Sequence, residues 1–124
     1  MGVDRLNRQG IDLAVVILTK NEEANLPFAL ASVCGWAREV YVFDSFSTDG
    51  TERIAREAGA VFVSNAFRDY SQQRNDALRL LPIRSGWTMF LDADEQLDEA
   101  LKQEIASQIE RGEHDAFRLR FKML

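Results

Sequence analysis

Cysteine and histidine are scarce in this 124-residue chain, and their scarcity excludes several kinds of site. Cys34 is the only cysteine, so the chain forms no disulfide within itself and holds no cysteine-based zinc cluster. His114 is the only histidine, which excludes a metal site built from several imidazoles of one chain. A single free thiol is typical of a reducing compartment, and we expect a cytoplasmic protein, with the inner face of the cell membrane as its other expected location.

Long apolar runs and an excess of basic residues are also missing. No hydrophobic run approaches the ~20 residues of a membrane-spanning helix, so we predict no transmembrane segment and only peripheral contact with a membrane. The chain has 20 acidic and 15 basic residues and a net charge of −5, so we expect no nucleic-acid partner. Its hydrophobic content of 46% is typical of a folded globular domain.

Strand and helix patterns alternate along the chain. The expected strands cover 13–18, 39–44, 61–64 and 87–91, and a half-exposed strand covers 116–124. The expected helices run from Asn25 to about Gly35 and over 50–58, 71–81 and 97–112, with Asp49 and Glu52 as a capping-box variant. Such alternation requires crossover connections, so we predict an α/β fold: a mostly parallel sheet with helices on both faces. We divide the chain into a flexible N-terminal arm, 1–10, and one domain, 11–124.

Carboxylates end the apolar run that begins at Trp87. Asp92 and Asp94 project the same way from an extended backbone, with their carboxylates roughly 6 to 7 Å apart. At an effective dielectric of ~20, two such charges repel by about 2 to 3 kcal/mol. Magnesium offsets such repulsion, since it is typically held by one or two carboxylates together with substrate phosphates. The alternative is a polar strand end followed by a helix N-cap at Asp94 or Asp98.

Acidic residues also follow two of the other apolar runs. Glu22 comes shortly after the run 13–18, and Asp44 ends the run 39–44. Because the carboxyl ends of parallel strands meet at one edge of a sheet, we expect these acids to converge with the Asp92–Asp94 pair. The sequence therefore predicts a binding crevice at that edge.

Four short segments carry a family resemblance. Val-Ile-Leu-Thr-Lys-Asn-Glu-Glu (16–23), Asp-Ser-Phe-Ser-Thr-Asp-Gly-Thr (44–51), Gln-Arg-Asn (73–75) and Leu-Asp-Ala-Asp-Glu (91–95) resemble motifs of the family 2 glycosyltransferases. They are similar, more narrowly, to the branch with bacterial lipopolysaccharide-core glucosyltransferases. The resemblance runs from about residue 13 to 110 and implies a Rossmann-like A-type glycosyltransferase fold. Such proteins have a nucleotide-binding half followed by an acceptor-binding half, and we expect this chain to contain only the first.

The resemblance also implies roles for individual residues. Asp44 would accept the N3–H of a uracil base, and the lesser alternative is an Asx-turn to the backbone amides of its own loop. Arg74 would face the diphosphate, and Glu95 would either support the metal residues or simply precede the next helix. The implied nucleotide-binding residues are Thr19, Asn21, Glu22, Asp44, Arg74 and Asp92, and Mn²⁺ or Mg²⁺ would be held by Asp94 and Asp92.

The implied activity is transfer of a sugar from a nucleoside-diphosphate sugar, with UDP as the expected nucleotide, to a saccharide or lipid-linked acceptor. The family supplies its catalytic base after the metal strand, and none of the acids that follow Asp94 matches it, so the base stays unassigned. The alternatives are a noncatalytic nucleotide-binding module and a haloacid-dehalogenase-like phosphatase with Asp92 as nucleophile. The strand expected at 116–124 predicts a homodimer or aggregation, because an unpaired strand edge templates association.

Overall fold

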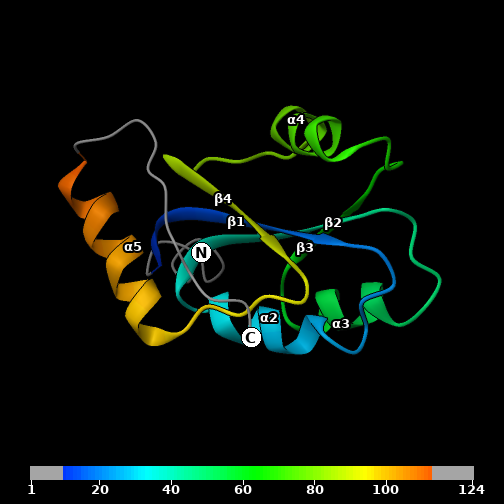
Figure 1. Cartoon of the computed structure of the whole chain (residues 1–124), viewed down its shortest axis with the longest axis horizontal. Coiled ribbons are helices and arrows are strands. Elements are labelled where there is room, and N and C mark those ends of the chain that lie inside the picture. The colour runs from blue at the N-terminus through cyan, green and yellow to red at the C-terminus, as the bar shows by residue number, and fades with distance from the viewer. Residues whose placement is uncertain (1–9, 113–124) are drawn as a thin grey trace, which may run out of the picture.

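The computed structural model describes residues 10–112, which form a four-stranded parallel sheet in the order β3-β2-β1-β4 (Figure 1). The strands are β1 (Ile11–Thr19), β2 (Ala37–Asp44), β3 (Val61–Ser64) and β4 (Trp87–Asp92). The helices are α2 (Leu26–Val33), α3 (Thr51–Glu57), α4 (Tyr70–Leu80) and α5 (Glu99–Arg111). The predicted α/β class and the parallel sheet are therefore confirmed.

Strand β1 is the centre of the sheet, because it pairs with β2 on one side and with β4 on the other. Every residue from Leu13 to Thr19 is buried, as expected of a central parallel strand covered on both faces. The register sets Thr19 opposite Asp44 and Leu18 opposite Asp92, so the polar ends of these strands meet at one edge.

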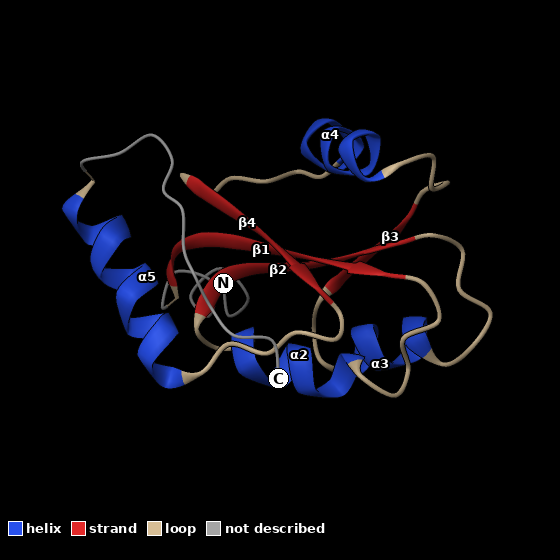
Figure 2. Ribbon diagram, viewed as in Figure 1, coloured by secondary structure: helices blue, strands red, loops and turns tan. Residues whose placement is uncertain are grey.

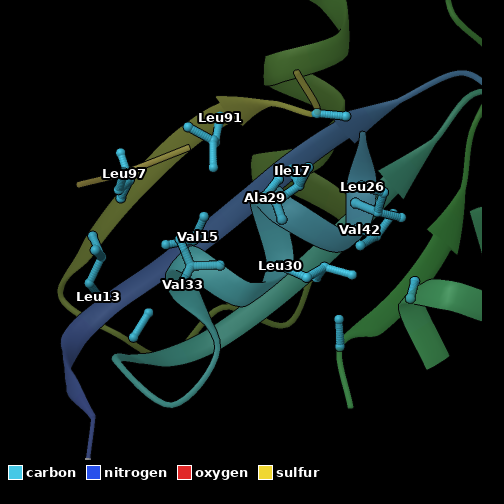
Figure 3. Packing of buried hydrophobic residues seen from close by; sticks show 14 of the residues in the cluster. Leu13, Val15, Ile17, Leu26, Ala29, Leu30, Val33, Val42, Leu91 and Leu97 are labelled. Atoms are coloured by element: carbon cyan, nitrogen blue, oxygen red, sulfur yellow. The ribbon is translucent and has the colours of Figure 1, made fainter. Parts of the chain in front are cut away.

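Helices cover both faces of the sheet, with α4 on one face and α2 and α3 on the other (Figure 2). The sheet has a hydrophobic core on each face. The side chains of β1 alternate between these two cores, since successive residues of a strand point to opposite faces. The larger core joins β1 to α2 through Leu13, Val15, Ile17, Leu26, Ala29, Leu30 and Val33 (Figure 3). Ile105 of α5 belongs to the same core. The smaller core joins β1 and β2 to the α4 side through Ala14, Val16, Leu18, Tyr41, Phe43, Ala77 and Leu81.

Some helix ends follow the expected capping chemistry, although the Asn25 side chain makes no capping hydrogen bond at the start of α2. Helix α2 has a proline in its first turn, where the missing N–H breaks no bond, and Gly35 after it has a φ of 84°. Helix α5 begins after Asp98, whose carboxylate accepts a hydrogen bond from the backbone N–H of Leu101 at 2.7 Å. Of the two residues considered as its N-cap, Asp98 is therefore the cap and Asp94 is not.

The expected capping box at α3 is wrong. The N-cap residue is Gly50, which has no side chain to accept a bond, and Glu52 pairs with Arg56 one turn along the helix at 2.9 Å. Asp49 instead accepts the backbone N–H of Thr51 at 3.0 Å, so its carboxylate closes the turn before the helix.

Several boundaries differ from those expected, and some expectations lie outside the described residues. Strands β1 and β2 each begin two residues earlier than their apolar runs, because Ile11 pairs with Ala37 at the start of the sheet. The N-terminal arm, apart from Gly10, and the strand expected at 116–124 are outside the described range, as is the dimer predicted from that strand. Within residues 10–112, no helix is long and apolar enough to cross a membrane.

Candidate functional site

A cleft of about 650 Å³ opens at the carboxyl edge of the sheet. Segments that follow all four described strands contribute to it, so it lies where the sequence predicted a binding crevice. Its lining residues are Leu18, Thr19, Lys20, Glu22, Ser45, Phe46, Ala66, Phe67, Tyr70, Gln73, Asp92, Ala93 and Asp94. Of the expected site residues, the structure thus brings Thr19, Glu22, Asp92 and Asp94 together.

Asp92 and Asp94 are exposed in the cleft, and Ala93 between them is buried. The expectation that an extended backbone carries both carboxylates is wrong, because β4 ends at Asp92 and a turn follows. The turn is closed by two hydrogen bonds between Asp92 and Glu95. The backbone N–H of Glu95 donates to the Asp92 carbonyl at 2.9 Å, and the backbone N–H of Asp92 donates to the Glu95 carboxylate at 2.7 Å.

Glu95 differs from its acidic neighbours because it is only 8% exposed. Burial raises the pKa of its carboxyl, and the nearby charges of Asp92 and Asp94 raise it further, while the Asp92 N–H opposes both effects. The structure therefore supports one of the two roles considered for Glu95. It is not a plain acid at the start of a helix, since its carboxylate holds the backbone of the turn that carries the aspartates.

The aspartate pair suits a hard divalent cation that is shared with a phosphate. Among residues 10–112, no group of three or more histidine, cysteine, aspartate or glutamate side chains is arranged to hold a metal ion without help. Magnesium typically uses one or two carboxylates and takes its remaining ligands from water and substrate phosphates. Two exposed carboxylates at the end of a cleft fit that kind of site, whereas they do not fit an all-protein metal cage.

Asp44 is 1% exposed and does not line the cleft. Its carboxylate accepts hydrogen bonds from the hydroxyls of Thr19 and Ser47, and from the Ser47 backbone N–H at 2.7 Å. The last of these bonds is the turn contact that the sequence left open as an alternative to base recognition. The contact with a nucleobase stays a prediction.

Asn21 and its neighbours bind the loop that follows β2. Asn21 has a φ of 51°, donates its backbone N–H to the Ser47 hydroxyl at 2.6 Å, and accepts the Thr48 N–H at 2.7 Å. Glu23 accepts the N–H of Gly50 at 2.6 Å, two residues along the same loop. In this structure Asn21 therefore positions one loop against another, and its contact with a nucleotide stays a prediction.

Arg74 lies on an exposed part of α4 and is not among the residues that line the cleft. Its guanidinium group sits 5.7 Å from the centre of the Phe90 ring, and its charge lowers the pKa of Glu95 against the larger effects that raise it. The side chain thus lies on the β4 side of the helix. Contact with a diphosphate stays a prediction for this residue.

Several cleft residues were not identified from the sequence. Lys20 donates from Nζ to the backbone carbonyls of Ser45 at 2.9 Å and Phe46 at 3.1 Å, so its charge is directed to the loop after β2. Phe67 and Tyr70 are exposed. Two aromatic residues in an otherwise polar segment are a sequence signal that could have indicated a binding surface. Gln73 shows no such signal, because nothing in the sequence sets its orientation on α4.

Comparison with known proteins agrees with this geometry. The family described as "Glycosyl transferase family 2" matches residues 14–121, which is most of the chain. The chain belongs to glycosyl transferase family 2. This membership agrees with the resemblance noted in the sequence, and it favours a glycosyltransferase over a phosphatase that uses Asp92 as nucleophile.

The relatives of this family 2 chain are mostly longer proteins. An uncharacterised glycosyltransferase of Rickettsia typhi is 37% identical over 93 residues, which are 75% of this chain and 31% of that protein. The lipopolysaccharide core biosynthesis glycosyltransferase LpsC of Rhizobium meliloti is 35% identical over 98 residues, 75% of this chain and 35% of LpsC. The chain thus spans about a third of the length of these relatives.

A solved structure shows the same fold. Glucosyl-3-phosphoglycerate synthase from Mycobacterium tuberculosis, in complex with Mn²⁺, UDP and glucosyl-3-phosphoglycerate, aligns with a TM-score of 0.57 and 27% identity. The alignment covers 74% of this chain and 36% of the synthase. The family 2 chain therefore corresponds to part of an A-type glycosyltransferase.

Proposed function

We propose that this chain is the donor-binding part of a glycosyltransferase that uses a UDP-sugar together with Mn²⁺ or Mg²⁺. The observation that carries the proposal is the cleft that Thr19 and Glu22 line together with the exposed Asp92 and Asp94. The mycobacterial synthase supports it, because its structures contain UDP with Mn²⁺ or with Mg²⁺.

In this proposal Asp94, assisted by Asp92, would hold the divalent cation. When bound, the cation would neutralise the charge that appears on the departing nucleoside diphosphate. The contribution of Glu95 is to fix the turn through its 2.7 Å hydrogen bond from the Asp92 N–H. A turn held in one conformation before the ligand arrives avoids part of the ordering cost of binding.

Thr19, Glu22, Asn21 and Asp44 belong to the nucleoside side of the proposed site. An ionised carboxylate is a strong acceptor for a ring N–H, which makes Asp44 suitable for reading a uracil base. Asp44 is 1% exposed and its carboxylate accepts donors from Thr19 and Ser47, so base recognition by Asp44 would require these side chains to move aside. Arg74 would likewise have to turn from Phe90 to reach a phosphate.

The proposed acceptor is a saccharide or a lipid-linked saccharide, and the proposed location is the cytoplasm, at the inner face of the cell membrane. The support for this class of acceptor is the 35% identity to LpsC. The catalytic base stays unassigned among residues 10–112. The second candidate is a noncatalytic nucleotide-binding module, which the unassigned base keeps open.

Calorimetry with UDP, GDP and CDP, each in Mn²⁺ and in EDTA, tests the donor proposal. We expect UDP to bind most tightly and to lose most of its affinity in EDTA. Equal binding of the three nucleotides, or equal binding of UDP in both buffers, would contradict the nucleotide or the metal assignment. Hydrolysis of a UDP-sugar by the chain would then decide against the noncatalytic candidate.

A further inference from the structure

One end of the cleft carries exposed aromatic rings. Phe46 is 59% exposed, Phe67 is 46% exposed and Tyr70 is 68% exposed, and each of them lines the cleft. We call these residues the aromatic rim. Large apolar side chains gathered at a concave, otherwise polar surface are typical of a binding site.

The aromatic rim and the carboxylates lie at opposite ends of the cleft. Phe67 and Tyr70 follow β3 and Phe46 follows β2, whereas Asp92 and Asp94 belong to the end of β4. The sheet order β3-β2-β1-β4 separates the ends of the outer strands by three strand spacings, about 14 Å. A ligand that crosses the cleft therefore meets rings at one end and acids at the other, on the scale of an extended nucleoside diphosphate.

The β3 side of the aromatic rim is held in place by contacts behind it. The rings of Phe67 and Tyr70 meet edge to face, with centroids 5.3 Å apart and planes at 73°. The segment that carries Phe67 is fixed to α4 by the buried carboxylate of Asp76, which accepts hydrogen bonds from Asn65 at 2.9 Å and from Arg68 at 3.3 Å. The rings are thus presented by an ordered segment.

Phe46 is presented by an unusual backbone conformation. Its φ of 54° lies in the left-handed region, which bulky residues rarely adopt. The Lys20 ammonium binds the Phe46 carbonyl at 3.1 Å, and the next N–H, that of Ser47, donates to Asp44 at 2.7 Å. These contacts hold the residue in place, and the ring projects into solvent at the cleft. Strained residues held in this way cluster at ligand sites.

We propose that the aromatic rim binds the flat face of the nucleobase while the diphosphate lies at Asp94. This inference rests on the proposed donor site and adds the residues that hold the base. Aromatic side chains stack on the π-face that every nucleobase presents, so the aromatic rim supplies affinity and does not choose among bases. The choice of base is left to hydrogen-bonding groups nearby.

The test compares UDP with inorganic pyrophosphate, which lacks the base, by calorimetry of the full chain in Mn²⁺. We expect Phe67→Ala and Tyr70→Ala each to weaken UDP binding by about 5- to 150-fold and to leave pyrophosphate binding unchanged. Phe67→Trp keeps an aromatic face and should stay close to the parent. Phe46→Gly removes a ring without conformational strain, because glycine accepts a positive φ, and should also weaken only UDP.

Phe28→Ala is the matched control, since Phe28 is as exposed as Phe46 but lies on α2 away from the cleft, and it should bind UDP like the parent. Thermal unfolding of each variant confirms that the fold is kept. Unchanged UDP affinity in the Phe67 and Tyr70 variants would overturn the inference and leave the donor site standing, and this is the result expected if the aromatic rim holds an acceptor ring instead. Equal weakening of UDP and pyrophosphate would also overturn it. If the parent binds neither ligand, the proposed donor site itself is wrong.

Discussion

Glu95 could act beside the proposed metal site in two ways: by positioning the turn through its hydrogen bond from the Asp92 N–H, or through its charge. Substitutions of Glu95 distinguish the two roles. Glu95→Gln keeps an oxygen that accepts this N–H, whereas Glu95→Ala leaves the N–H without its acceptor. A hydrogen bond to a charged group contributes about 1.5 to 3 kcal/mol. If the ligand binds only when the turn is closed, Glu95→Ala should weaken Mn²⁺-dependent UDP binding by about 10- to 150-fold.

Glu95→Gln should stay within a few-fold of the parent, because Glu95 positions the turn and is not a ligand. Since burial raises the pKa of Glu95, the neutral amide also avoids the cost of burying a charge, and the free energy of unfolding should not fall. Calorimetry with UDP and Mn²⁺, together with urea unfolding of both variants, measures these effects. If Gln weakens binding as much as Ala does, Glu95 acts through its charge, and the positioning role is refuted.

Further predictions concern base recognition, acid stability and the core. Asp44→Asn should reduce the preference for UDP over CDP while the need for Mn²⁺ persists, and an unchanged preference would remove Asp44 from the base site. Hydrogen bonds from Gln72 and other donors hold the pKa of Asp76 below its usual range, so its ionised form stabilises the fold above about pH 4 and that stability is lost on acidification. Asp76→Asn should therefore lower the Tm at neutral pH and make it less sensitive to acid between about pH 5 and pH 2; parallel Tm curves would contradict this. Ile17→Ala, at a fully buried position, should cost about 2 to 5 kcal/mol in urea unfolding, and a loss well below that range would mean that the core collapses around the site.

The sheet and its crevice could be predicted because the determining signals are local. An apolar run such as 13–18 buries both faces of a strand, and alternation with helices then brings the carboxyl ends to one edge. The same arrangement places Thr19 and Asp44 at that edge, where the observed register sets them opposite each other. Asp92 and Glu22 lie in the cleft for the same reason, because Asp92 ends β4 and Glu22 follows β1 at this edge.

The remaining features depend on contacts between segments that are distant in sequence or on the direction of single side chains. Asp49 accepts the N–H of Thr51 at the start of α3 and also the Glu23 N–H at 3.2 Å, from a loop 26 residues earlier, and the sequence did not show this second contact. The turn after Asp92 could not be read from the strand pattern, since it depends on how deeply Glu95 is buried. The orientation of Arg74 toward Phe90 is likewise a property of the folded helix.

The central claim is that Asp94 holds a cation that bridges the chain to a nucleoside diphosphate. UDP binding to Asp94→Ala, measured by calorimetry in Mn²⁺ and in EDTA, tests it most directly. Glu99→Ala is the matched control, because it removes the same charge from a side chain that is 78% exposed and lies outside the cleft. We predict that Asp94→Ala loses most of the affinity in Mn²⁺ and almost none in EDTA, while Glu99→Ala binds like the parent in both. An Asp94→Ala variant that binds UDP in Mn²⁺ as tightly as the parent would contradict the claim.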